Sequence, residues 1–179
     1  MLMDDRTVRC IEDARRGDQV AFESLVRPLV GQAHRLAYGM LRDHHAAEDA
    51  VQEATLRAWR RFHQFREGST IRPWYLAIVA NECRSLLRHR WRRVLTMEEL
   101  PEAGAATEET TVSSLDLERA LARLTFEHRV VLCLFYFLDL PQEEIAHTLG
   151  IRVGTVKSRV NRAIRSLRRH MAVPEEWMT

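Results

Sequence analysis

The stretch PQEEIAHTLGIRVGTVKSRVNRAIRSLRRHM, residues 141–171, decides the fold of the second half of this chain. Pro141 suits the first turn of a helix, and Gly150 suits the position just after a helix end. The apolar spacing on either side of the glycine predicts helices over residues 142–149 and 153–171. Two helices joined by so short a turn are typical of a helix-turn-helix, which inserts its second helix into the DNA major groove.

The second of these helices has two chemically different faces at about 100° per residue. Its apolar stripe contains Val156, Val160, Ala163, Ile164 and Leu167. The opposite side carries the polar and cationic residues Ser158, Asn161, Arg162, Arg165 and Arg169, with Lys157 and Arg159 on the flanks. Guanidinium groups bind phosphate and guanine edges bidentately, and Asn pairs with adenine in a similar way. The alternative is an ordinary surface helix with a solvated basic face, but the turn and the partner helix favour DNA binding.

Charge is distributed in blocks, although the net charge of the 179 residues is only +2. Residues 84–93 contain five Arg and no acid, and residues 157–169 are again basic without an acid. Between them, residues 97–118 contain seven acids and no base. Two basic blocks separated by an acidic stretch predict two nucleic-acid contacts joined by a segment that avoids duplex DNA.

The three cysteines, Cys10, Cys83 and Cys133, are widely spaced and form no metal-binding motif. They are interpreted as thiols in a reducing compartment, with a redox-sensing role as the less favoured alternative. The charged N-terminus does not resemble a signal peptide, and no apolar run approaches the length of a membrane span. We therefore expect a cytoplasmic protein without membrane insertion.

Helical periodicity dominates the chain and predicts an all-α fold of two small domains joined by a flexible linker. The first domain covers residues 1–93, with helices over 18–41, bent or broken at Pro28, over 44–63 behind an Asp43 N-cap, and from about Pro73 to Arg93. Residues 94–113 are poor in large apolar side chains and are interpreted as the linker. The second domain covers residues 114–179, with helices near 115–123, 126–138, 142–149 and 153–171, and a fraying tail.

Two surfaces of the first domain are candidate binding sites. The helix over 44–63 has an alanine-rich inner face and an outer stripe of Asp49, Gln52, Glu53, Leu56 and Arg60, which suits a protein partner or is simply a solvated face. The loop that follows brings together Phe62, Phe65, Trp74 and Tyr75 with several Arg residues. Aromatic rings interleaved with Arg suit unstacked single-stranded bases. The alternative is that these rings fill the core, and this alternative is favoured for Phe62 and Tyr75.

No catalytic signature is present, and we expect no enzymatic activity, cofactor or metal. His44, His45, Glu48 and Asp49 have a spacing that could hold a metal ion. Acidic residues in the first turns of a helix are explained more simply by the positive end of the helix dipole.

Taken together, these motifs resemble bacterial RNA polymerase sigma factors of the extracytoplasmic-function (ECF) group within the sigma-70 family. The resemblance lies in AAEDAVQEATLRAW (46–59), FREGSTIRPWYLAIVANECRSLLRHRWRR (65–93) and EEIAHTLGIRVGTVKSRVNRAIRSLR (143–168). It covers nearly the whole chain in the order of the family, with a region 2-like domain first and a region 4-like helix-turn-helix domain last.

The resemblance implies a role for each segment. Contacts with the β′ clamp helices of core RNA polymerase would come from Asp49, Gln52, Glu53 and Leu56. Contacts with the −10 element of promoter DNA would come from Arg60, Phe65, Arg66, Trp74, Asn81, Arg84 and Arg88. Contacts with the −35 element would come from Thr155, Lys157, Ser158, Arg159, Asn161, Arg162 and Arg165. The resemblance also implies a contact with the β flap and an anti-sigma factor as a further partner.

The chain departs from the family pattern at three places. Thr55 stands where the family usually has Phe, and Ile71 stands where it usually has an aromatic residue in the loop. The segment after the Trp reads Tyr75-Leu76-Ala77 instead of Leu-Tyr-Arg. Two of the three departures lie in the segment that the resemblance assigns to the −10 element.

Three other functions remain open from the sequence. A stand-alone transcriptional regulator would explain residues 141–171 but not the first domain. An adaptor or decoy could bind polymerase without reading DNA. A metal-dependent enzyme would have to use His44 and Glu48.

Overall fold

The computed structural model describes residues 5–66, 68–96, 117 and 119–171, and every element in those ranges is helical. The first unit contains α1 (Asp5–Arg15), α2 (Gln19–Val26), η1 (Arg27–Leu29), α3 (Val30–Leu41), α4 (His44–Arg61), η2 (Phe62–Gln64) and α5 (Ile71–Thr96). The second contains a helical turn at 119–122, then α7 (Phe126–Leu132), η3 (Cys133–Phe137), α8 (Gln142–Leu149) and α9 (Val153–Met171).

Helix boundaries in the first unit follow local chemistry. Pro28 lies in the 3-10 turn η1 and separates α2 from α3, because proline lacks the amide hydrogen that a continuous helix requires. Asp43 caps α4 by accepting a hydrogen bond from the Ala46 amide at 3.0 Å. Both boundaries were predicted from the sequence.

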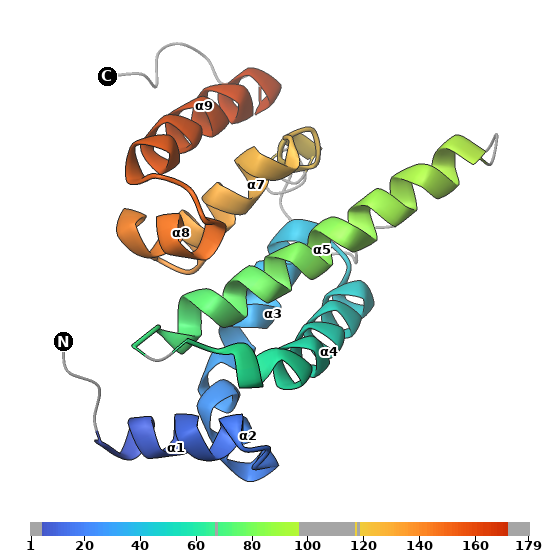
Figure 1. Ribbon diagram of the computed structural model, residues 1–179. Coiled ribbons are helices and arrows are strands. Elements are labelled where there is room, and N and C mark those ends of the chain that lie inside the picture. Colours follow the sequence, from blue (N-terminus) through green and yellow to red (C-terminus); the bar gives the residue numbers. More distant parts are fainter. Residues whose placement is uncertain (1–4, 67, 97–116, 118, 172–179) are drawn as a thin grey trace.

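α5 is the longest helix described and crosses the first unit diagonally (Figure 1). Pro73 lies within its first turn, as predicted. The helix continues to Thr96, three residues beyond the predicted end at Arg93. The rest of the predicted linker, 97–113, and the tail, 172–179, lie outside the described residues.

The second unit differs from the prediction in one helix. The single helix expected over 126–138 is α7 followed by a π-helical turn, η3, in which the Leu138 amide donates to the Cys133 carbonyl at 3.2 Å. Such a turn changes the direction of the side chains that follow it. Tyr136 and Phe137 consequently remain exposed, while Cys133 and Leu134 are buried.

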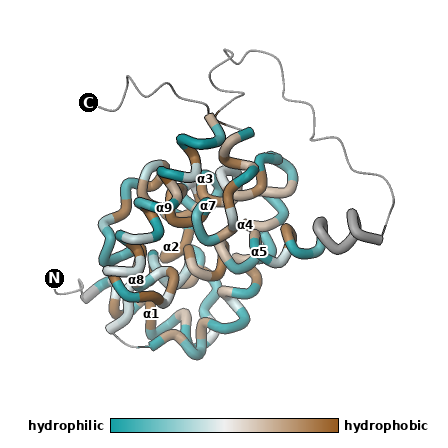
Figure 2. The backbone as a smooth tube through the Cα atoms, turned by 90° about the horizontal axis from the view of Figure 1, so that it is seen from above, coloured by the Kyte–Doolittle hydropathy of each residue, from teal (hydrophilic) through white to brown (hydrophobic). Residues whose placement is uncertain are grey.

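The two units pack against each other through one continuous core. α5 contacts α8, and α3 contacts both α7 and η3 (Figure 1). Apolar residues gather where these helices meet, and polar residues lie at the periphery (Figure 2). This contact was not predicted, because the residues involved lie far apart along the chain.

Candidate polymerase and promoter interfaces

The proposed clamp-binding stripe lies on the side of α4 that faces away from the core. Asp49 and Gln52 are exposed, Leu56 is 49% exposed, and Glu53 is half-buried. On the opposite side of the helix, Ala47, Ala50, Ala54 and Ala58 are buried and allow α3 and α5 to approach closely. An exposed Leu beside carboxylate and amide groups is suited to a protein partner.

Arg57 connects this stripe to α5. Its guanidinium lies 3.0 Å from Glu53 on the same helix and 3.0 Å from Glu82 on α5. Glu82 is only 5% exposed, and a buried carboxylate requires a partner of this kind. The two carboxylates raise the pKa of Arg57, chiefly through the hydrogen bond that Arg57 donates to Glu53. This role of Glu82 was not predicted, because no neighbouring residue in the sequence marks it as buried.

The aromatic residues around the predicted loop form a compact cluster. Phe62 stacks on Phe65 with ring centroids 5.3 Å apart, and Trp74 meets both rings edge to face at 5.6 and 5.2 Å. Phe62 and Tyr75 are fully buried, as the sequence favoured. Phe65 is only 1% exposed, so the expected stacking of this ring on a DNA base does not fit its position. Its ring instead packs against Trp74, which is half-buried.

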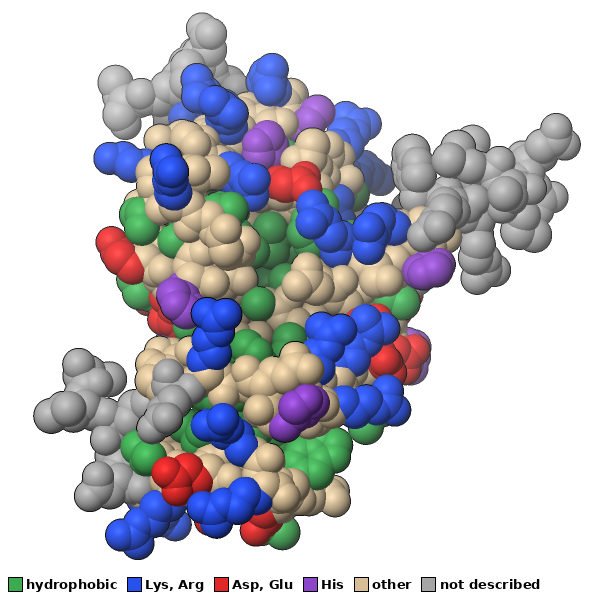
Figure 3. All heavy atoms as spheres, in the orientation of Figure 1, with side chains coloured by type: hydrophobic (Ala, Val, Ile, Leu, Met, Phe, Trp, Pro, Cys, Tyr) green, Lys and Arg blue, Asp and Glu red, His purple; other side chains and the backbone are tan. Residues whose placement is uncertain are grey.

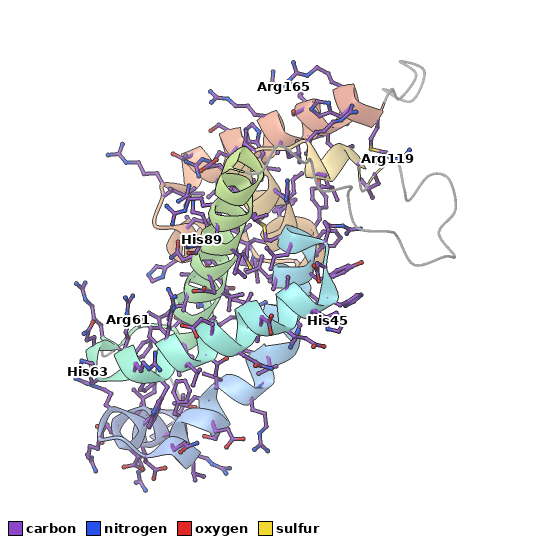
Figure 4. All side chains as sticks on the ribbon, turned by 90° about the vertical axis from the view of Figure 1, so that its right-hand side faces the viewer. His45, Arg61, His63, His89, Arg119 and Arg165 are labelled. Carbon is purple, nitrogen blue, oxygen red and sulfur yellow. The ribbon has the colours of Figure 1, made fainter. Side chains whose placement is uncertain are left out.

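The remaining candidate −10 residues surround this cluster and the exposed side of α5. Arg60, Arg66, Asn81 and Arg88 are exposed. Arg61 and His63 project from the same end of α4, where the chain leaves the helix (Figure 4). Arg84 is different because its guanidinium pairs with Glu127 of α7 and lies 4.7 Å from the centre of the Phe126 ring. A cavity of about 100 Å³ beside it is lined by Asn81, Arg84 and Arg159 among others.

α8 and α9 form the predicted helix-turn-helix. Gly150 ends α8 with φ 64 and ψ 35, a left-handed conformation that glycine adopts without strain. Its amide and the Ile151 amide bond back to carbonyls in the last turn of α8, which fixes the sharp turn into α9. Val156, Val160 and Ala163 are buried against the rest of the unit.

The outer face of α9 carries the candidate −35 residues. Lys157, Asn161, Arg162 and Arg165 are exposed, whereas Thr155, Ser158 and Arg159 are half-buried. The Ser158 hydroxyl donates to the Thr155 carbonyl at 3.0 Å, so its proton already takes part in a hydrogen bond within the helix. Lys and Arg side chains gather at the α9 end of the molecule (Figure 3). Arg165 points away from the body, at the opposite end from Arg61 and His63 (Figure 4).

Nothing in the described part of the chain resembles a metal centre, because no three His, Cys, Asp or Glu side chains come together there. His44 stacks instead on Tyr38, with ring centroids 4.2 Å apart. None of the described helices is long and apolar enough to cross a membrane.

Comparison with known proteins decides between the functions that the sequence left open. The Sigma-70 region 2 family matches residues 25–93, and the Sigma-70 region 4 family matches residues 120–169. The ECF RNA polymerase sigma factor SigE of Mycolicibacterium smegmatis is 34% identical over 94% of this chain and 69% of that protein. SigW of Bacillus subtilis, also an ECF sigma factor, is 30% identical over 90% of this chain and 94% of that protein.

This chain belongs to the ECF RNA polymerase sigma factors.

Solved structures agree with this assignment. The sigma factor RpoE of Bartonella quintana, in complex with the anti-sigma factor NepR, matches with a TM-score of 0.69 and 28% identity, over 85% of this chain and 97% of that one. CnrH, in complex with the cytosolic domain of CnrY, has the same fold, with a TM-score of 0.67 and 22% identity over 94% of this chain and 98% of that one.

The two units of this sigma factor are called the region 2 unit (5–96) and the region 4 unit (117–171) below. α1 and the first part of α2 lie outside both matched ranges.

Proposed function

We propose that this sigma factor uses α4 to bind core RNA polymerase, α5 and the preceding loop to bind the −10 element, and α9 to bind the −35 element. It directs transcription to particular promoters, as its family does. The assignment of residues to these three partners rests on one observation: the fold has three separate surfaces that differ in chemistry. These are the mixed stripe of α4, the aromatic and basic surface of the loop and α5, and the cationic face of α9.

For the polymerase contact, Asp49, Gln52 and Leu56 present carboxylate, amide and apolar groups within two turns of α4. Glu53 is held by Arg57, which keeps its carboxylate in one place before the partner arrives. The side chain of Leu56, 49% exposed, would become buried on binding.

For the −10 element, the half-buried Trp74 provides the aromatic surface, and Phe65 packs against it. Arg60, Arg66, Asn81 and Arg88 would contact bases or backbone of the opened strand. Arg84 belongs to the same surface, but its guanidinium is already paired with Glu127. Unpaired bases trapped on this surface would hold the promoter open while the polymerase begins synthesis.

For the −35 element, α9 would lie in the major groove. Asn161, Arg162 and Arg165 are exposed within about one turn of each other, so they can reach base edges and phosphates. Lys157 and Arg159 on the flanks would contact phosphates and give the binding its salt dependence. The sigma factor itself would carry out no chemical step, because RNA synthesis belongs to the polymerase.

An anti-sigma factor is the further partner that we propose, because the Bartonella quintana relative was solved with one. We also place this protein in the cytoplasm, where the polymerase and promoter DNA lie.

Reconstitution with core RNA polymerase tests the proposal. The purified chain and core enzyme would be incubated with a library of genomic promoter fragments, and the transcript starts would be sequenced. Specific starts that share upstream −35 and −10 sequences are expected. Transcripts no more selective than those of core enzyme alone would contradict the proposal, and a failure to bind core enzyme would favour a stand-alone regulator.

A further inference from the structure

We propose that Glu82 of α5 is a positioning residue for polymerase binding: acting through Arg57, it holds the Glu53 carboxylate of α4 in the orientation that core RNA polymerase contacts. This inference rests on the polymerase role proposed above for α4. Glu82 cannot reach the polymerase itself, because its side chain is buried.

The first support is the burial of Glu82 with a single kind of compensation. Among the residues whose side chains the structure describes, no other carboxylate or cationic side chain is buried to this degree. A carboxylate removed from water is costly unless a cation lies beside it. Nη1 of Arg57 lies 3.0 Å from Oε2 of Glu82. No described group donates a well-aligned hydrogen bond to that oxygen, so the ion pair with Arg57 is what compensates its charge.

Arg57 reaches Glu53 through a different nitrogen of the same guanidinium. Its Nε donates to Oε1 of Glu53 at 3.0 Å, one turn earlier on α4. The planar fork of an arginine can serve two carboxylates at fixed angles, which the single ammonium of a lysine cannot. Glu53, Arg57 and Glu82 therefore form a chain of contacts that runs from the surface of α4 to the interior of α5.

Glu82 is the member of this chain that fixes the other two. The side chains of Arg57 and Glu53 are 46% and 42% exposed, and an exposed pair one turn apart on a helix is weak by itself. Arg57 cannot swing away from Glu82, however, without leaving a buried charge unpaired. The orientation of Arg57, and with it that of Glu53, is therefore set from α5, which packs beside α4 (Figure 1).

An ordered carboxylate is an advantage at a protein interface. Glu53 remains partly exposed while it accepts the hydrogen bond from Arg57, so it is still available to a partner. A side chain that is ordered before binding loses less conformational entropy when the complex forms. Glu82 would thus raise the affinity for core RNA polymerase without touching the polymerase.

The alternative is that Glu82 only stabilises the packing of α4 against α5. A second polar contact crosses the same interface and separates the two roles. The hydroxyl of Tyr75 on α5 lies 2.7 Å from that of Thr55 on α4, and this contact involves neither Arg57 nor Glu53. A general loosening of the interface would follow from loss of either contact, whereas a loss of Glu53 positioning would follow only from loss of Glu82.

The test measures the affinity of the full chain for immobilised core RNA polymerase. Glu82→Gln keeps the shape of the side chain but removes its charge, and it should weaken binding roughly 3-fold to 10-fold, as expected when one side chain must become ordered on binding. Tyr75→Phe should change the affinity by less than about 2-fold. Glu23→Gln is a matched control, because it breaks an exposed ion pair with Arg27 on α2, outside the proposed interface, and should also have little effect.

Coupling between the variants shows whether Glu82 acts through Glu53. In a Glu53→Ala background, Glu82→Gln should cause less than about 2-fold further loss, because no carboxylate remains to be positioned. In a Leu56→Ala background, the effect of Glu82→Gln should persist in full. Arg57→Lys alone should reproduce the loss, because a lysine cannot hold both carboxylates. Circular dichroism and urea unfolding verify that each variant is folded.

Two outcomes would overturn the role of Glu82. One is an unchanged affinity in Glu82→Gln, and the other is an equal loss in the presence and absence of the Glu53 carboxylate. If Glu82→Gln does not fold, Arg57→Lys carries the same test in the two backgrounds, because the side chain of Arg57 is half-exposed. Failure of the unaltered chain to bind core RNA polymerase would instead contradict the proposed function of α4.

Discussion

The hydroxyls of Thr55 on α4 and Tyr75 on α5 lie 2.7 Å apart in the centre of the region 2 unit. Thr55 donates its only hydroxyl proton to the Val51 carbonyl at 2.7 Å, so Tyr75 must be the donor to Thr55. Both positions depart from the pattern of the family, in which Phe is usual at the first and Leu at the second. The structure shows that the two departures belong together, since Thr55 supplies the acceptor for the buried Tyr75 hydroxyl.

Substitutions at this pair should therefore have unequal effects. Thr55→Val leaves the fully buried Tyr75 hydroxyl without an acceptor and should lower the free energy of unfolding by about 1–3 kcal/mol. Tyr75→Phe removes the donor instead and should cost only about 1 kcal/mol. The double variant should be less destabilised than the sum of the two. Urea unfolding followed by circular dichroism measures all three, and additive effects would show that the hydroxyls do not interact.

The exposed Leu56 gives a prediction for polymerase binding. Leu56→Ala should weaken binding to core RNA polymerase by about 1–2 kcal/mol, roughly 5-fold to 30-fold, without changing the free energy of unfolding. Val20→Ala is the matched control, because Val20 on α2 is even more exposed, at 76%, and lies outside the proposed interface. Surface-immobilised core enzyme and the two purified variants provide the measurement. Equal affinities would remove Leu56 from the interface.

The exposed face of α9 gives a prediction for −35 binding. Arg162→Ala should weaken binding of the reconstituted enzyme to a promoter identified by transcript sequencing by about 1–3 kcal/mol if it contacts a base. The loss should disappear at a promoter whose −35 element has been scrambled. Arg123→Ala, which removes an exposed arginine outside α9, should have little effect. An unchanged −35 footprint in the Arg162→Ala enzyme would exclude a base contact.

The two buried thiols predict a loss of stability in alkaline solution. Burial raises the pKa of both Cys83 and Cys133 to about 12, whereas an unfolded thiol ionises near pH 9. The native state therefore holds these protons after the unfolded state has lost them, so stability is complete below about pH 9 and falls above it. The expected loss is roughly 1–3 kcal/mol by about pH 10. Urea unfolding across this range measures it, and Cys83→Ala with Cys133→Ala should flatten the dependence.

Arg129 gives a prediction for the stability of the region 4 unit. It donates to four backbone carbonyls, including that of Met40, and its buried position lowers its pKa through desolvation. Arg129→Met should lower the free energy of unfolding by about 2–4 kcal/mol, because partly buried carbonyls would lose their donor. Arg123→Met is the control and should change it by less than about 0.5 kcal/mol. Similar losses in both variants would show that the hydrogen bonds of Arg129 contribute little.

The sequence by itself determined the local structure and the chemistry of the surfaces. The break at Pro28, the Asp43 cap, the Gly150 turn and the two faces of α9 all depend on residues within a few positions of each other. Interactions of this range are set by backbone geometry and by apolar spacing, so they can be predicted from a single chain. Family membership follows from the same local motifs.

Only the tertiary structure decided which of these side chains remain accessible to a binding partner. Phe65 was expected at a base and lies in the core, because Phe62 and Trp74 close around it. Glu82, Arg129 and the Arg84–Glu127 pair depend on contacts between helices that are distant in sequence. Whether a side chain is buried or paired depends on packing, and packing depends on the positions of whole helices relative to each other. The type of an individual residue does not predict the position of its helix in the fold.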